Sequence, residues 1–94
     1  MRAIEDILSD DLLSLYVEMP PASRADFKAK GEEAAGKIRR MIDSAAVVAK
    51  DILEVIVTWL KMIPGVNKFF LEQEAKIKTD KILAFVAEQK KKQI

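Results

Sequence analysis

The 94-residue chain contains no cysteine and no histidine. Without cysteine there can be neither a disulfide framework nor a thiolate metal site. Without histidine, the commonest general acid–base group and the commonest transition-metal ligand are both missing. We therefore expect a protein that is not an enzyme and that has no cofactor, no metal site and no small-molecule substrate.

Glycine and proline are also scarce, with three residues of each. Half of the residues are hydrophobic and a third are charged, which is the composition of a helical globular protein. The length fits one small helical domain over residues 1–94. A domain of this size buries only a modest core, so association with another chain would stabilise it.

Positive and negative charges are nearly balanced, because the net charge is only +1. Residues 1–22 carry one arginine against five acidic residues, whereas residues 66–94 carry seven lysines against four acidic residues. An acidic beginning and a basic end can attract each other within one chain or between two copies. The first residues are acidic and amphipathic and lack the basic and apolar regions of a signal peptide, which favours a cytoplasmic protein.

A short N-terminal helix is expected at about residues 3–18. Its apolar residues recur at spacings of three and four, as on one face of a helix. They are Ile4, Ile7, Leu8, Leu12, Leu15 and Tyr16. Pro20 and Pro21 end it, because a residue that precedes proline is disfavoured in the helical conformation.

The most apolar helix-compatible stretch runs from Ser44 to Ile63. Its hydrophobic residues, with those just before it, cover an arc of roughly 220° around a helix, whereas an ordinary surface helix needs about 100°. We expect this central helix to contact two or three neighbouring helices. Either the same chain or a second copy could supply them.

Pro64-Gly65 is the clearest turn signal in the chain, and Asn67 is a suitable N-cap for the helix that follows. The sequence therefore predicts an antiparallel helical hairpin with arms at about 37–63 and 67–91. Together with the N-terminal helix, this hairpin gives an all-α fold, a three- to four-helix bundle.

No proline interrupts residues 24–63, which contain Gly31 and Gly36. A continuous helix over this range would be roughly 60 Å long, about twice the diameter of a compact domain of this size. We expect a bend or break near the two glycines, with a continuous helix as the alternative. The glycines could also permit the close approach of a neighbouring helix, or could simply be tolerated.

The first functional hypothesis is a non-enzymatic interaction or scaffold protein, either a homo-oligomer or bound to a helical protein partner. The wide apolar face of the central helix motivates self-association. The candidate partner-contact residues lie on this face and around the turn, and are Val48, Val55, Trp59, Met62, Phe69 and Phe70. For the aromatic residues that flank the turn, a cluster capping the hairpin core is favoured over an exposed anchor.

Two alternatives remain at this stage. The apolar run after Ser44 is about 19 residues long, so a membrane-associated or pore-forming protein is conceivable. It is disfavoured because Lys50, Asp51, Glu54 and Lys61 interrupt the run, and each costs about 2.5–3.5 kcal/mol near the bilayer centre. The second alternative is a small nucleic-acid-binding protein, made unlikely by the acidic residues interleaved with the basic ones over 24–43.

Overall fold

The fold is all-α, as the sequence predicts. A computed structural model describes residues 2–10, 12–44 and 48–92. Across these residues it contains helices and connecting turns but no strand. The helices are α1 (Arg2–Ser9), α2 (Leu13–Glu18), α3 (Pro21–Asp43), α4 (Ala49–Leu60) and α5 (Lys68–Lys92).

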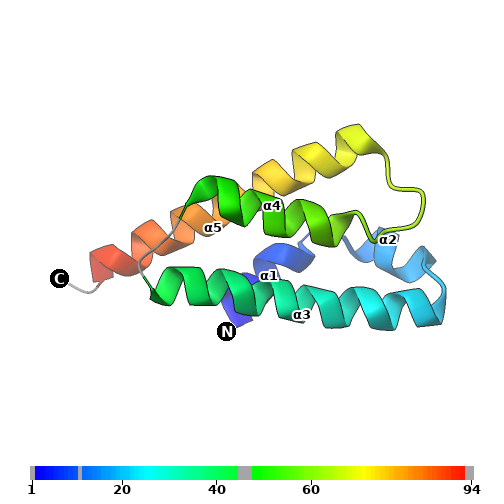
Figure 1. The fold of residues 1–94 in the computed structure, drawn as a ribbon, viewed down its shortest axis with the longest axis horizontal. Helices are drawn as coiled ribbons and strands as arrows, with labels where there is room; N and C mark the ends of the chain where they lie inside the picture. The colour runs from blue at the N-terminus through cyan, green and yellow to red at the C-terminus, as the bar shows by residue number, and fades with distance from the viewer. Residues whose placement is uncertain (1, 11, 45–47, 93–94) are drawn as a thin grey trace.

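Four of the helices form a closed ring. α3 packs against α4, α4 against α5, α5 against α1, and α1 against α3. Figure 1 shows that α4 runs antiparallel to both α3 and α5, while α2 lies at the same end of the molecule as the α4–α5 turn. The arrangement is the predicted bundle, elongated to 46 Å along its longest axis.

One hydrophobic core fills this ring. Every helix of the ring contributes buried apolar side chains that repeat at helical spacing. They include Ile4 and Leu8 from α1, Phe27, Ala34, Ala35 and Ile38 from α3, Ile52, Ile56, Trp59 and Leu60 from α4, and Leu71, Ala75, Ile82 and Val86 from α5. Within the same chain, α4 has neighbours on two sides, which accounts for most of the wide apolar arc of the central helix.

The predicted first arm of the hairpin, residues 37–63, is wrong as a single helix. α3 ends at Asp43, and Val48 has an extended backbone (φ −118°, ψ 120°) before α4 begins at Ala49. Residues 45–47 of the predicted arm lie outside the described residues. Ser44 closes α3, since its hydroxyl donates to the Met41 carbonyl oxygen at 3.1 Å. The chain reverses direction between α3 and α4, and α3 therefore packs alongside α4.

The predicted break near Gly31 or Gly36 is also wrong, and so is the alternative of a continuous helix over 24–63. α3 passes both glycines without interruption over 23 residues. It begins at Pro21, where the fixed φ of proline suits the first turn of a helix. Each glycine lowers the stability of a helix by about 1 kcal/mol. Burial of Phe27, Ala34, Ala35 and Ile38 on one continuous helix offsets that loss.

The predicted helix over 3–18 is divided in two. α1 ends at Ser9 with tight turns, in which the Asp10 amide lies 3.3 Å from the Ile7 carbonyl and the Leu12 amide 3.2 Å from the Ser9 carbonyl. Ile4, Leu8 and Leu12 are buried as the periodicity predicts. The interruption leaves the Asp10 carbonyl available to a side chain of α5, described below.

The turn between α4 and α5 is confirmed. Gly65 has a positive φ of 68°, a conformation that L side chains rarely adopt. The Asn67 side-chain oxygen accepts hydrogen bonds from the amides of Phe69 at 2.8 Å and Phe70 at 3.2 Å, so Asn67 caps α5.

Trp59 fastens α4 to α3. Its ring stacks on Phe27 with centroids 4.5 Å apart and an interplanar angle of 13°. Its indole Nε1 donates to the Phe27 carbonyl oxygen at 2.9 Å. A Cβ at Gly31 would lie 2.9 Å from Cζ2 of Trp59. Gly31 therefore permits the close approach that the sequence offered as one explanation, whereas Gly36 would meet nothing closer than 4.0 Å.

The two glycines of α3 give a matched pair of alanine substitutions. Gly31→Ala should lower the free energy of unfolding by about 1 kcal/mol, because overpacking against the indole costs about 1–3 kcal/mol and exceeds the gain in helix propensity. Gly36→Ala should raise it by about 0.5–1 kcal/mol. Urea unfolding of both variants measures the difference. Equal stabilisation by the two alanines would contradict the close α3–α4 contact.

Candidate interaction site

An open groove of about 550 Å³ lies between α3 and α4, and we refer to it as the α3–α4 groove. Its lining residues are Lys30, Glu33, Ala34, Lys37 and Met41 from α3, with Asp51, Glu54, Val55, Thr58, Trp59 and Met62 from α4 and the residues that follow it.

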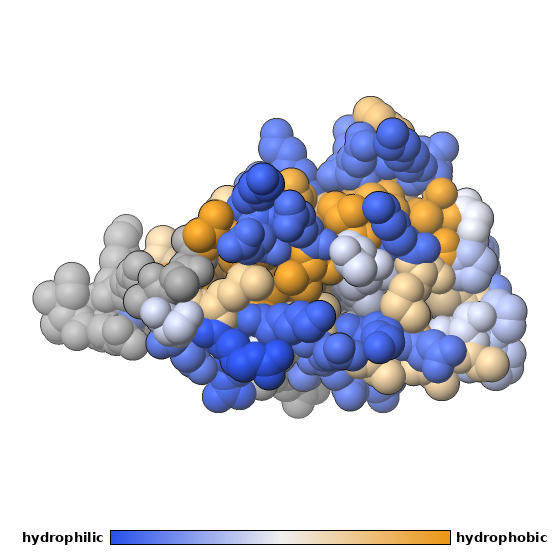
Figure 2. Space-filling view, in the orientation of Figure 1, coloured by the Kyte–Doolittle hydropathy of each residue, from blue (hydrophilic) through white to orange (hydrophobic). Residues whose placement is uncertain are grey.

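The floor of the groove is apolar. Met62 is 37% exposed, while Met41 and Val55 are half-buried. Val55 lies within α4, whereas Val48 precedes the first residue of α4 and Met62 follows its last residue. Val48 is 48% exposed. Figure 2 shows hydrophobic surface along the middle of this face, over α4, between hydrophilic regions.

The two walls of the groove are charged. On the α3 wall, Glu33 lies between two lysines, with its carboxylate 3.2 Å from Lys30 Nζ and 4.0 Å from Lys37 Nζ. The α4 wall contributes Asp51 and Glu54. All five side chains are exposed, so the pairs on α3 orient side chains more than they stabilise the fold.

The structure gathers only part of the predicted contact set. Val55, Trp59 and Met62 line the α3–α4 groove, whereas Val48, Phe69 and Phe70 do not. Trp59 is buried against α3, Phe69 is 68% exposed at the start of α5, and Phe70 is half-buried against the core. Trp59 is therefore not held by the predicted capping cluster of these three aromatic residues, because its ring stacks on Phe27 of α3.

Sequence reasoning missed the α3 side of the groove, formed by Lys30, Lys37 and Met41 among others. These residues are spaced so that they share one face of α3. That spacing was visible in the sequence, but nothing in it indicated which helix this face would meet. The chain reversal before α4 decides that.

A second cleft of about 520 Å³ lies between α1, α2 and α3, with Trp59 on its inner side. Leu8, Leu12, Tyr16 and Phe27 contribute its apolar lining. Its polar lining residues are Glu5, Asp6, Ser9, Lys28 and Glu32. In the described part of the chain, no group of three potential metal ligands is close enough together to hold a metal ion.

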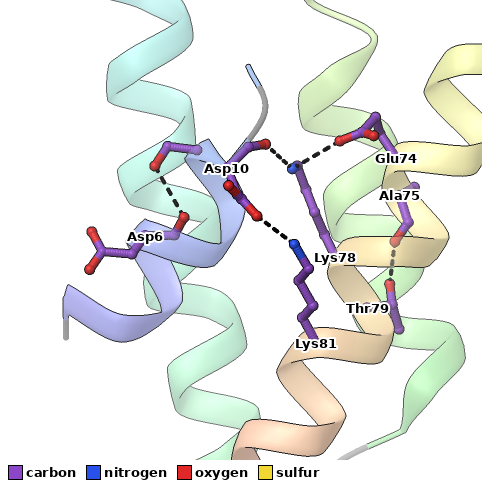
Figure 3. A network of polar contacts seen from close by, with 8 residues as sticks. Asp6, Asp10, Glu74, Ala75, Lys78, Thr79 and Lys81 are labelled. Carbon is purple, nitrogen blue, oxygen red and sulfur yellow. Dashed lines mark hydrogen bonds and ion pairs between the residues drawn. The ribbon is translucent and has the colours of Figure 1, made fainter. Parts of the chain in front are cut away.

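A buried lysine joins α5 to the interruption between α1 and α2. Lys78 is only 1% exposed, and its Nζ donates to the Asp10 carbonyl oxygen at 2.6 Å and to Glu74 Oε1 at 3.1 Å. Lys81 forms an ion pair with the Asp10 carboxylate. Figure 3 shows Lys78 and Lys81 rising from α5 toward Asp10. The spacing of four residues between Glu74 and Lys78 is visible in the sequence, but the burial of Lys78 is not.

This network connects α5 to the residues between α1 and α2. The amine of Lys78 lies between the Asp10 carbonyl oxygen and the Glu74 carboxylate and donates a hydrogen bond to each. No buried side-chain nitrogen or oxygen within the described residues lacks a hydrogen-bond partner. A fully satisfied buried ion pair fixes the position of the helices it joins.

Among the described helices, none combines the length and the apolar character that crossing a bilayer requires. The apolar run after Ser44 yields the 12-residue helix α4 instead.

Removal of the buried amine should be costly. Lys78→Ala leaves the Glu74 carboxylate and the Asp10 carbonyl without their buried partner, and should lower the free energy of unfolding by about 3–5 kcal/mol. The control Lys30→Ala breaks an exposed pair and should cost less than about 1 kcal/mol. Urea unfolding measures both. Similar losses for the two variants would show that Lys78 is not held as described.

Comparison with known proteins gave no match to a family model, to a curated protein or to a solved structure.

Proposed function

We propose that this chain is a cytoplasmic, non-enzymatic interaction module that self-associates through the α3–α4 groove. The observation that supports it is the open apolar floor, Met41, Val55 and Met62, between two charged walls. An apolar centre with a polar, charged rim is the usual anatomy of a protein interface.

The fold narrows the contact surface that the sequence suggested. Because α3 and α5 cover α4 on two sides, the surface left for a partner is a strip rather than the whole apolar arc. Met41, Val55 and Met62 mark this strip. In a symmetric contact each copy contributes the same strip, which doubles the apolar surface removed from water.

The basic residues of α3 support this proposal over nucleic-acid binding. Glu33 engages both Lys30 and Lys37, and Arg39 Nε lies 3.9 Å from the Asp43 carboxylate. Phosphate binding relies on basic side chains that release counterions on contact. Here several of those side chains already have acidic partners one helical turn away.

A charge placed in the groove should prevent self-association. Met62→Glu would put a carboxylate into the apolar contact, and should raise the dimer dissociation constant by about a hundredfold or more. The matched control is Phe69→Glu, which changes a more exposed hydrophobic residue outside the groove and should leave association unchanged. Sedimentation velocity over a range of concentrations measures both.

Circular dichroism should show the same helix content for both variants, since both positions are exposed. A wild-type chain that remains monomeric at hundreds of micromolar would overturn the proposal. Equal weakening by Met62→Glu and Phe69→Glu would show that the groove is not the contact surface.

A further inference from the structure

The two walls of the α3–α4 groove differ in the sign of their charge. The α3 wall carries Lys30 and Lys37 around one glutamate, so its excess is positive. The α4 wall carries Asp51 and Glu54, and no basic residue lines it. A face that is positive on one side of an apolar strip and negative on the other restricts how a second copy can be laid upon it.

Lys37 lies level with the acidic residues along the groove. Trp59 lies against Gly31, which sets the register of the two helices. From that contact, Lys37 is six residues further along α3, and Glu54 is five residues back along the antiparallel α4. At a rise of about 1.5 Å per residue, the two positions agree to within a residue or two.

Two symmetric arrangements can bring this face of two copies together. With the two-fold axis across the groove, α3 lies over α3 and α4 over α4, so walls of like charge meet. With the axis along the groove, each α3 lies over the α4 of the other copy, so walls of opposite charge meet. Like charges across an interface are unfavourable, and complementary charges fix the orientation.

We propose that the groove binds a second copy of this chain about a two-fold axis that runs along the groove. Lys37 of each copy then pairs with Asp51 and Glu54 of the other. This inference rests on the proposed self-association and adds its geometry.

The resulting four helices, two α3 and two α4, form a bundle in which every helix runs antiparallel to both neighbours. That is the up-down order of simple four-helix bundles. It also sets the positive end of each helix dipole beside the negative ends of its neighbours.

Cross-linking of single-cysteine variants tests the axis, because the chain has no cysteine of its own. Lys37→Cys and Glu54→Cys are prepared separately and treated with a short bismaleimide, alone and as an equal mixture. A covalent dimer should form in the mixture and not in either variant alone. The control Ala84→Cys, on an exposed position of α5, should form none with itself or with either groove variant.

The outcomes separate this inference from the proposed function. A dimer from Lys37→Cys alone would place the axis across the groove and overturn the arrangement while self-association stands. Cross-links from Ala84→Cys as strong as those from the mixture would overturn it as well. A monomer in sedimentation velocity, without cross-links, would overturn the proposed function itself.

Charge reversal gives a second test in the intact association equilibrium. Lys37→Glu and Glu54→Lys should each raise the dimer dissociation constant about tenfold, because each occurs twice in a symmetric dimer. The double variant should bind more tightly than either single variant and should recover part of the lost affinity. The 37–54 pair is restored with its signs exchanged, whereas Asp51 keeps its negative charge. A double variant as weak as the single ones would overturn the pairing.

Discussion

The structure depends on the contact between Trp59 and α3. The indole stacks on Phe27, donates to its carbonyl oxygen and occupies the space that a side chain at Gly31 would fill. This contact holds α4 on α3 in one register and encloses one side of the core. It also places the charged residues of the two walls at the same height along the α3–α4 groove. The geometry of the proposed interface therefore depends on a contact in the core.

The architecture followed from the sequence where local signals were strong. Apolar periodicity predicted an all-α fold, and Pro64-Gly65 with Asn67 predicted the α4–α5 turn. The chain reversal after Asp43 could not be predicted, because no proline or glycine marks it. The reversal places α3 beside α4, and the two helices pack together.

The candidate site was predictable only on one helix. Val55, Trp59 and Met62 line the groove as the sequence suggested, whereas Val48 does not. Phe69 and Phe70 are absent from the groove because the turn directs them elsewhere. The opposite wall required knowledge of which helix lies beside α4. The role of Gly31 was similarly undetermined, since a glycine that admits an indole looks the same in sequence as one that is merely tolerated.

The bond from Lys78 to the Asp10 carbonyl joins residues that are 68 positions apart in the chain. Closing so long a loop has an entropic cost that must be met before the contact forms. We expect this contact to form late in folding, after the α3–α4 and α4–α5 pairs, whose residues are closer in the chain. An interaction absent from the transition state acts on the rate of unfolding. We therefore expect the buried lysine to slow unfolding and so to lengthen the lifetime of the native state.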